Sequence, residues 1–377
     1  MASMLLALFV SIVLTMLIVR HASTRSRMVD HDLTGPQKFH VVPVPRVGGL
    51  GIVAGLIAAV IHQSLVGAPS GSDLGLILMV CAIPAFAFGL AEDLTKQVSA
   101  RVRLLATAAS AVLAFWLLDA QLRHTAIPGL DLIVSFTVGA LVVTVFAVAG
   151  IANAMNIIDG FNGLASMCAV IMLAGLAYVA FQVGDPLLGT LAVAGIGAVL
   201  GFFIWNFPAG LVFLGDGGAY FLGFYIAELS VLLLARNPAV SPMFPLLLCI
   251  YPVFETVFSM YRRRFLRQQP PSMPDGIHLH SLIYRRVMRW AVGPKTARAM
   301  ARRNSMTSPY LWLLCTSSVV PAVLFWRQTA VLVGCLVVFA LAYIVLYWRI
   351  VRFKSPRWLR FGRSRALWPD ATREQEV

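Results

Sequence analysis

Eleven long apolar runs constrain the fold of this chain more than any other feature of its sequence. Most of them approach the roughly 20 residues that an α-helix needs to cross about 30 Å of hydrocarbon. Only 12% of the 377 residues are charged, whereas a soluble domain carries about a quarter. We therefore expect an all-α polytopic integral membrane protein without a separate soluble domain. The expected spans are residues 2–19, 47–66, 74–91, 104–118, 132–149, 164–182, 187–205, 219–235, 242–260, 310–326 and 329–348.

The distribution of the cations predicts the orientation of these spans. No basic segment precedes the first run and its first cations follow it, so we expect a retained first helix with the amino terminus outside. Numbered from that end, the inward-facing segments hold 27 of the 30 Lys and Arg residues, which also places the carboxyl terminus in the cytoplasm. The net charge of +14 is therefore a topology signal rather than a sign of nucleic-acid binding. The same cations can hold anionic lipid or phosphate groups.

The chain divides by composition into two parts. We expect a transmembrane domain at residues 1–348, which includes the long inward loop 261–308, and a basic cytoplasmic tail at 349–377 without a catalytic role. The five cysteines lie in apolar spans without CxxC spacing and are predicted to be small buried hydrophobic residues. The GxxxG pair Gly197 and Gly201 predicts close helix packing. The glycines of residues 48–51 are compatible with packing and with a backbone approach to substrate.

A polar stretch, Asn153–Ala165, interrupts the apolar pattern between two runs. It holds three Asn, one Asp and two Gly in thirteen positions. Lipid offers such groups no partner, so they must face protein, water or a ligand. In a helix, Asn153, Asn156 and Asp159 would form one stripe, and the Asp-Gly and Asn-Gly steps would then end that helix.

A second polar segment, residues 206–219, carries Asp216 between glycines at the start of the eighth span. Glycines let a phosphate approach the backbone, and the amino end of a helix favours negative charge. The segment is not a Walker A loop, because no Gly-Lys-Ser/Thr follows. A turn is the alternative interpretation, although a turn does not require an Asp among membrane-facing residues.

Two further inward clusters also have an ordinary structural interpretation. Prolines before the second span predict an extended approach to it, and Lys38 and Arg46 in this segment either hold phosphate or anchor the chain at the membrane surface. At the end of the third span, the adjacent carboxylates of Glu92 and Asp93 would oppose one another, which raises a pKa or recruits a cation. If the helix continues for a turn, Lys96 lies on their face. The alternative is a helix cap with a surface ion pair.

The long inward loop adds positive hydrogen-bond donors. His278 and His280 lack the third ligand and the Cys of a zinc site, so we interpret them as donors to a diphosphate. The nearby arginines suit the same role; they are Arg262, Arg263 and Arg264.

Two glutamates lie inside apolar spans, at Glu228 and Glu255. A charge at the middle of the bilayer costs roughly 3 kcal/mol on insertion scales. We expect structural ion pairing to be the role of both residues; for the deeper Glu228, a protonated side chain or one that faces the bundle interior is the alternative.

Three aspartates come from three different inward loops: Asp93, Asp159 and Asp216. Few carboxylates with many cations suit Mg²⁺ shared between the protein and phosphate oxygens. Phosphoryl chemistry then needs positioning and charge neutralisation more than an elaborate nucleophile. The sequence thus predicts an enzyme site on the cytoplasmic face of the membrane.

These clusters, in this order, resemble the polyprenyl-phosphate N-acetylhexosamine-1-phosphate transferases. That family includes undecaprenyl-phosphate GlcNAc-1-phosphate transferase and phospho-N-acetylmuramoyl-pentapeptide transferase. The likeness spans about residues 38–285. The family's Asp-Asp-x-x-Lys, Asn-x-x-Asn-x-x-Asp-Gly-x-Asp-Gly-Leu, Asn-x-Pro…Phe-x-Gly-Asp-x-Gly and basic His-x-His-His motifs resemble, in turn, Glu92–Lys96, Asn153–Leu164, Asn206–Gly218 and Arg262–Ser281. This chain departs from those motifs at Glu92, Asn162 and Ser281.

The resemblance implies transfer of a sugar 1-phosphate, from GlcNAc or another N-acetylhexosamine, from a UDP-sugar to undecaprenyl phosphate with release of UMP. It implies Mg²⁺, with Mn²⁺ as an alternative, and a start to lipid-linked surface-polysaccharide synthesis in the bacterial cytoplasmic (inner) membrane. The implied partners are the two substrates and the bilayer, without nucleic acid, and a homodimer is compatible with it.

The resemblance also assigns the site. It implies that Asp216 is the magnesium ligand, with Asp93 and Asp159 as further candidates, and that Glu92 and Asp93 hold the lipid phosphate or accept its proton. The expected catalytic residues are Glu92, Asp93, Asp159 and Asp216. The expected substrate-binding residues are Lys38, Arg46, Lys96, Asn153, Asn156, Asn162, Asn206, Arg262, Arg263, Arg264, His278 and His280.

Three other functions remain open at this point. A transporter or flippase of lipid-linked sugars would place charges along a path at the bilayer midplane, and would show repeat symmetry that is not visible here. A peptidoglycan-branch phospho-MurNAc-pentapeptide transferase has a contiguous His run, whereas His-x-His-Ser resembles the GlcNAc branch. A membrane scaffold would need none of these polar clusters.

Overall fold

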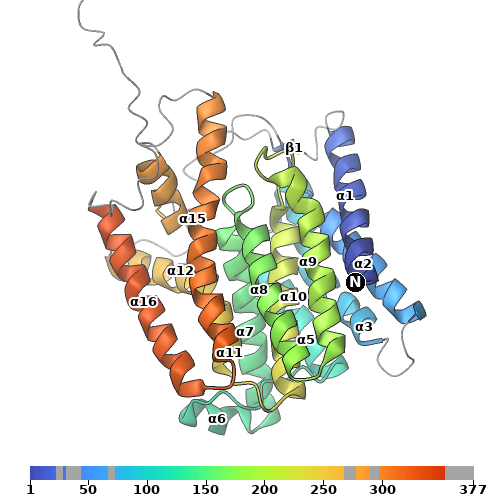
Figure 1. The fold of residues 1–377 in the computed structure, drawn as a ribbon, viewed down its shortest axis with the longest axis vertical. Coiled ribbons are helices and arrows are strands. Elements are labelled where there is room, and N and C mark those ends of the chain that lie inside the picture. The colour runs from blue at the N-terminus through green and yellow to red at the C-terminus, as the bar shows by residue number, and fades with distance from the viewer. Residues whose placement is uncertain (23–28, 31–43, 67–72, 267–276, 289–296, 353–377) are drawn as a thin grey trace, which may run out of the picture.

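The computed structural model describes residues 1–22, 29–30, 44–66, 73–266, 277–288 and 297–352, so Lys38 and most of the expected basic tail lie outside the described residues. The described helices form one bundle, and most of them run along its long axis (Figure 1). The first half contains α1 (Ala2–Ala22), α2 (Gly49–Val66), α3 (Asp73–Cys81), α4 (Ile83–Thr95), α5 (Ala100–Leu117), α6 (Pro128–Val134), α7 (Thr137–Ile158) and α8 (Leu164–Gln182). The second half contains α9 (Pro186–Asn206), α10 (Gly215–Arg236), α11 (Met243–Leu248), α12 (Ile250–Tyr261), η2 (Arg262–Leu266), α13 (Leu279–Leu282), η3 (Ile283–Val287), α15 (Ala297–Leu324) and α16 (Thr329–Val351).

The helices confirm a polytopic membrane protein. Among the described residues, nine helices are long and apolar enough to cross a membrane, or ten if the bent pair α3 and α4 counts as one span. The expected ninth span, residues 242–260, is instead divided at Cys249 into α11 and α12, each too short to cross alone. The cysteines are free and mostly buried, as the sequence predicted.

Two other expected spans differ from the helices that form. Residues 74–91 do not make one straight helix, because α3 and α4 meet at a 43° bend. Pro84 lies at the start of α4, and the amide of Ala85 bonds Ser110 Oγ at 3.0 Å rather than continuing the helical ladder. Helix α7 begins at Thr137 and extends to Ile158, beyond the expected end at residue 149. Its polar last turns remain helical because they face other helices.

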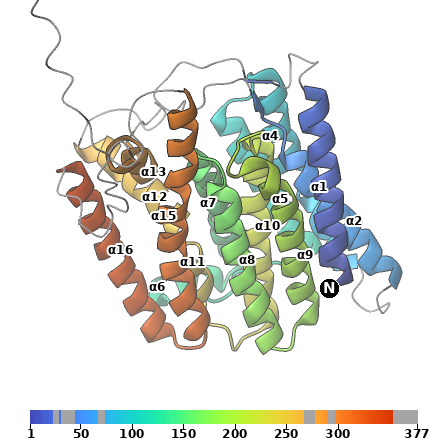
Figure 2. The ribbon, with the colours of Figure 1, turned by 45° about the horizontal axis from the view of Figure 1, so that its top comes forward.

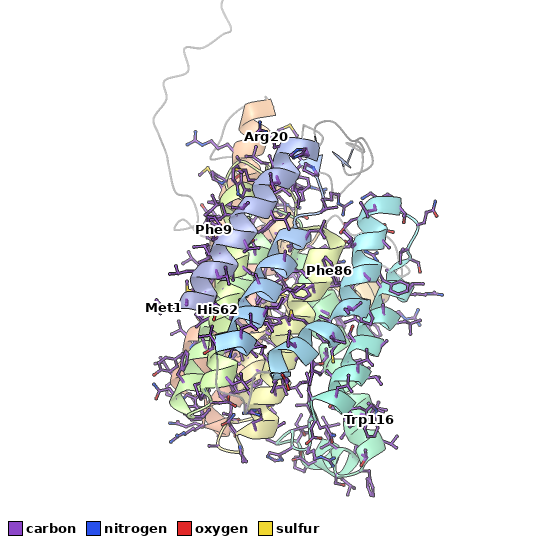
Figure 3. The ribbon with its side chains drawn as sticks, turned by 90° about the vertical axis from the view of Figure 1, so that its right-hand side faces the viewer. Met1, Phe9, Arg20, His62, Phe86 and Trp116 are labelled. Carbon is purple, nitrogen blue, oxygen red and sulfur yellow. The ribbon has the colours of Figure 1, made fainter. Side chains whose placement is uncertain are left out.

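The short strands hold the chain at one end of the bundle, which we call the site end. Strand β1 (Val29–Asp30) pairs antiparallel with β2 (Val44–Pro45). The carbonyl of Pro45 accepts a hydrogen bond from the amide of Phe213 at 2.8 Å, so β2 also joins the segment before α10. This geometry confirms the extended approach to α2. Arg20, at the end of α1, lies at the same end of the bundle, and Trp116 lies near the other (Figure 3).

Helix α10 lies at the centre of the bundle. In its most apolar stretch 89% of the residues are buried, against 17% in both α1 and α16. It packs against α7, α4, α2 and α8, and Figure 2 shows it behind α8. Side chains at the start of α10 can therefore meet groups from several other helices.

Glycines allow the backbones of these helices to meet at the site end. A Cβ on Gly49 of α2 would lie 2.5 Å from the Cα of Gly218, and one on Gly89 of α4 would lie 2.6 Å from the Cα of Gly217. Gly49, the first residue of α2, thus serves helix packing. The expected packing of Gly197 is confirmed as well, because its added Cβ would lie 2.3 Å from the Met4 carbonyl oxygen of α1.

We predict that Gly49→Ala destabilises the protein, because the new methyl group would meet the backbone of Gly218. Overpacking of this kind costs about 1–3 kcal/mol. The measurement is the apparent melting temperature in detergent. Gly334→Ala is the control, since nothing lies within 4 Å of its added Cβ and alanine favours a helix. Equal melting temperatures for the two variants would contradict the role of this contact.

Candidate active site

The carboxylate of Asp93 closes the amino end of α10. One carboxylate oxygen accepts the backbone N–H of Asp216 and the other accepts that of Gly217, both at 2.9 Å. The first amides of a helix lack partners within the helix and carry its positive dipole end, so a buried carboxylate is well placed there. Asp93 is only 4% exposed. It ties the end of α4 to the start of α10, and both of its oxygens are engaged with the protein's own backbone.

Gly215 makes room for this contact. Its φ of +77° lies in the left-handed region that favours glycine. A Cβ there would lie 2.5 Å from a carboxylate oxygen of Asp93 and would overlap the carbonyl of Arg46. Only glycine therefore lets α4, the segment before α2 and the start of α10 meet at one point.

Two arginines face the side chain of Asp216. Its carboxylate pairs with the guanidinium of Arg103 from α5, and a guanidinium nitrogen of Arg46 lies 4.0 Å from its other oxygen. The Arg103 guanidinium also lies over the ring of Tyr220, 5.7 Å from its centroid. The predicted metal ligand is thus held between positive charges that come from two other parts of the chain.

Sequence reasoning missed Arg103. A signal was present, because Arg103, Thr107 and Ser110 follow the i, i+4, i+7 spacing of one helix face in an otherwise apolar run. Both Thr107 and Ser110 are fully buried. This polar stripe faces the bundle and would have identified Arg103 as an inward-pointing cation.

Asp159 joins the same electrostatic cluster. It follows the last residue of α7, as the predicted helix break requires, and the next helix begins at Leu164. Enclosure by the protein raises the pKa of the Asp159 carboxyl to about 7, and the charge of Arg46 opposes that rise. Asp93 lies close enough to Asp159 for the two carboxyl groups to interact. The three predicted aspartates therefore converge.

The asparagines fall into two groups. Asn153 accepts a hydrogen bond from the Tyr220 hydroxyl at 3.2 Å, and Asn156 also interacts with that hydroxyl, so the predicted α7 stripe faces α10. Asn206 is buried and joins two loops, because it accepts the amide of Gly163 at 2.6 Å and donates to the carbonyl of Val212 at 2.7 Å. Its contacts give it a loop-positioning role that the sequence did not reveal.

Asn162 is held against α15. Its backbone N–H donates to Asn304 Oδ1 at 2.9 Å, and its backbone carbonyl accepts the hydroxyl of Ser308 at 2.6 Å. The indole N–H of Trp312 donates to the carbonyl of Gly163 at 3.0 Å. Polar groups of α15 thus fix the loop that follows Asp159, and sequence reasoning gave α15 no part in the site.

The two histidines lie against that loop. The rings of His278 and His280 stack with centroids 5.1 Å apart, and His280 packs edge-to-face on Phe161 at 5.4 Å. A Cβ on Gly160 would lie 3.2 Å from Nε2 of His280. The His-x-His segment therefore reaches the residues next to Asp159.

The predicted arginines of the long loop have different surroundings. Arg262 is buried and donates to the carbonyl of Ile277 at 2.8 Å and to the Tyr347 hydroxyl. Arg263 is partly exposed and Arg264 is exposed. Arg262 thus holds the segment before His278.

At the end of α4, the carboxylates of Glu92 and Asp93 bind different backbone amides. Glu92 accepts the amide of Val98 at 2.8 Å, while Asp93 caps α10. The helix stops at Thr95, and Lys96 is exposed with a left-handed φ of 58°, so the extra helical turn that would align Lys96 with both carboxylates does not form. Lys96 still interacts electrostatically with Asp93.

The two membrane glutamates differ. Glu255 has the expected structural role, with one oxygen 3.0 Å from Nδ1 of His278. For Glu228 the prediction of ion pairing is wrong within the described residues, because both carboxyl oxygens are buried without a hydrogen-bond partner there. Its place inside the central helix α10 surrounds it with apolar side chains of the core.

The donor set fits a magnesium ion shared with substrate. The described residues contain no group of three or more His, Cys, Asp or Glu that would form a complete protein cage. Mg²⁺ is usually held by one or two carboxylates together with substrate phosphates. Asp216 and Asp159 supply such oxygens, and both interact with Arg46.

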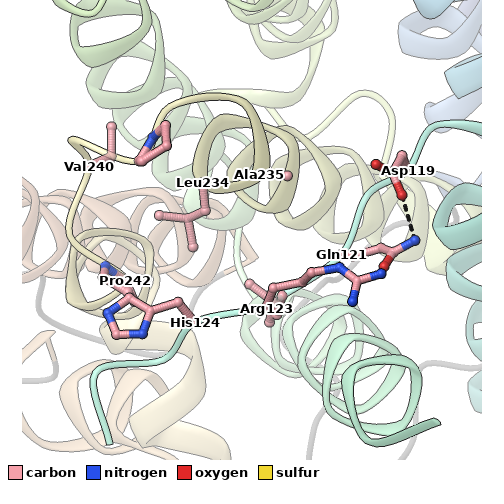
Figure 4. Close-up of a pocket in the computed structure, with 10 residues that line it drawn as sticks. Asp119, Gln121, Arg123, His124, Leu234, Ala235, Val240 and Pro242 are labelled. Atoms are coloured by element: carbon pink, nitrogen blue, oxygen red, sulfur yellow. Dashed lines mark hydrogen bonds between the residues drawn. The ribbon is translucent and has the colours of Figure 1, made fainter. Parts of the chain in front are cut away.

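A separate cavity of about 400 Å³ lies at the far end of α10 (Figure 4). It is lined by Arg123, His124, Leu234 and Pro242, among others. None of the predicted site residues borders it.

We predict that Asp93→Asn destabilises the protein, because an amide group would face the N–H of Gly217 instead of accepting it. Leaving one buried donor unsatisfied costs about 1–3 kcal/mol. The measurement is again the melting temperature in detergent. Glu92→Gln is the neighbouring control, since Glu92 accepts one amide with one oxygen and is partly exposed. A larger loss in Glu92→Gln would contradict the capping role of Asp93.

Comparison with known proteins gives this geometry a family. The sequence profile of glycosyl transferase family 4 matches residues 75–234, which include the three aspartates and Arg103. The chain is 32% identical over 252 residues, 66% of this chain and 68% of the relative, to a probable undecaprenyl-phosphate N-acetylglucosaminyl 1-phosphate transferase of Bacillus subtilis. It is 27% identical over 339 residues, 80% of this chain and 78% of the relative, to a decaprenyl-phosphate N-acetylglucosaminephosphotransferase of Mycolicibacterium smegmatis.

The other branch of these enzymes is represented as well. A phospho-N-acetylmuramoyl-pentapeptide-transferase of Mycobacteroides abscessus is 30% identical over 265 residues, 60% of this chain and 74% of the relative. The span matched by the family profile contains the motifs at Glu92–Lys96, Asn153–Leu164 and Asn206–Gly218. The chain belongs to glycosyl transferase family 4, among the polyprenyl-phosphate N-acetylhexosamine-1-phosphate transferases.

Proposed function

We propose that this protein transfers a sugar 1-phosphate, from GlcNAc or another N-acetylhexosamine, from a UDP-sugar to undecaprenyl phosphate. One observation carries the proposal: three aspartates and two arginines from separate segments of the chain meet at the amino end of the central helix of a membrane protein. The names of the relatives support the polyprenyl phosphate acceptor and the GlcNAc-1-phosphate group. These relatives are bacterial enzymes named for lipid phosphates, which supports a place in the bacterial cytoplasmic membrane.

The reaction exchanges one phosphoanhydride bond for another. An oxygen of the lipid phosphate attacks the sugar-bearing phosphorus of the UDP-sugar. The bond from that phosphorus to the oxygen bridging the two phosphates breaks, and UMP leaves with that oxygen. The products are a lipid-linked diphosphate sugar and UMP, so no oxidant or further reactant is required.

Asp216 and Asp159 would hold Mg²⁺ together with diphosphate oxygens. When bound, the ion neutralises charge on the phosphoryl group that is transferred. Asp93 fixes the start of α10, and thereby the backbone from which Asp216 projects. Substrate phosphates would compete with Asp216 for Arg103 and Arg46, which are placed to receive negative charge.

The histidine pair and the asparagine stripe would complete the proposed site. His280 lies against residues next to Asp159 and His278 stacks on it, and both would donate to a diphosphate. Asn153 and Asn156 face Tyr220 and would bind the nucleotide sugar through their side-chain amides.

The function is tested with membranes that contain the protein, radiolabelled UDP-sugars and undecaprenyl phosphate. We expect UMP release and a labelled lipid product with a UDP-N-acetylhexosamine. A panel of donors distinguishes the sugar, and activity with UDP-MurNAc-pentapeptide alone would move the protein to the peptidoglycan branch. No UMP release with any donor would count against the proposal and favour a transporter.

We also predict that Asp216→Asn lowers turnover by at least about a hundredfold, because the loss of a magnesium ligand removes several kcal/mol of charge stabilisation. The protein should still insert in the membrane. Asp73→Asn is the control, since Asp73 is an exposed carboxylate that starts α3. A near-normal rate for Asp216→Asn would remove this residue from the site.

A further inference from the structure

Glu255 is the centre of a buried hydrogen-bonded chain at the His-x-His segment. It is 1% exposed, and one of its oxygens receives both Nδ1 of His278 and the amide of Leu279, each at 3.0 Å. Its other oxygen accepts the hydroxyl of Tyr343 at 2.6 Å. Burying an ionised carboxylate is costly unless such donors satisfy it.

Helix α16 supplies the outer end of this chain. Tyr343 and Tyr347 lie one helical turn apart, and while Tyr343 holds Glu255, Tyr347 contacts Arg262. The Arg262 guanidinium lies 5.3 Å from the Tyr347 ring centroid and bonds the carbonyl of Ile277. The last described helix, which lies outside the residues matched by the family profile, therefore supports the His-x-His segment through two residues: Tyr343 bonds Glu255, and Tyr347 contacts Arg262.

The contact with Glu255 also fixes the state of the His278 ring. An ionised carboxylate can only accept a hydrogen bond, so Nδ1 of His278 must carry the hydrogen in this pair. Nε2 is then the nitrogen whose proton can change, as when a histidine is oriented by a carboxylate on its other side. The ring stacks on His280, which in turn contacts Gly160 and Phe161 beside Asp159.

We propose that Tyr343 and Glu255 are positioning residues, which orient His278 and through it His280 over the Asp159 loop. The inference rests on the proposed function. In this proposal α16 orients residues of the site in addition to crossing the membrane. Neither Tyr343 nor Glu255 touches the substrate phosphates in this scheme, so their loss should reduce turnover rather than binding of the nucleotide sugar.

The test compares Tyr343→Phe and Glu255→Gln with the parent protein. Loss of an orienting partner on a working histidine lowers activity by about 10- to 100-fold, and we expect that drop in kcat with KM for the UDP-sugar changed less than about threefold. Glu255→Asp, which keeps the charge, should recover part of the turnover. Tyr225→Phe is the matched control, because its buried hydroxyl bonds the carbonyl of Leu191 at 2.8 Å away from the histidines.

A second measurement does not depend on activity. Carbethoxylation of the histidines in the intact protein, followed by mass spectrometry of the peptide that contains residues 277–284, should proceed faster in Tyr343→Phe than in the parent or in Tyr225→Phe. Equal modification rates, or an unchanged kcat per folded molecule in both Tyr343→Phe and Glu255→Gln, would overturn the positioning role. Absence of UMP release from the parent protein would instead refute the proposed function, and the modification rates would still decide this inference.

Discussion

The pair of hydrogen bonds from the start of α10 to Asp93 is the interaction on which the site depends. A helix that begins inside a membrane protein presents amides that neither lipid nor its own backbone can satisfy. Asp93 supplies the missing acceptors from a different helix, so the end of α4 and the start of α10 have a fixed relation. Asp216 projects from that fixed point toward two arginines. The geometry of the candidate site and the stability of the central helix thus depend on the same carboxylate.

The convergence of Asp93, Asp159 and Asp216 was predictable because lipid offers no partner to polar residues between apolar runs. Such residues must face protein, water or a ligand. The positive-inside pattern and the helix-breaking Asp-Gly steps together placed these residues at the ends of helices on one side. The family likeness added their order. The break of α7 after residue 158 followed from the same local signals, because Asp-Gly and Asn-Gly steps disfavour a continuing helix wherever they occur.

The hydrogen-bond and ion-pair partners of the site residues were much harder to predict than the positions of these residues at the helix ends. Nothing in the spacing of Glu92 and Asp93 indicates that one caps a local turn while the other reaches a helix more than a hundred residues away. Arg103, Asn304 and Tyr343 entered the site through tertiary packing, and a hydropathy pattern does not encode which helices become neighbours. Glu228 shows the reverse error, because the cost of burying a charge suggested a partner that the described residues do not contain.

The glycine contacts between α2, α4 and α10 have a consequence for how such enzymes can diversify. Backbones that meet without intervening side chains cannot move closer together. The helices that carry Asp93 and Asp216 therefore cannot shift to suit a bulkier sugar. Under the proposed function, a change of donor preference would then arise in a connecting segment, such as the residues after α7. The same rigid helices can in this way accept different sugars when only the connecting segments change.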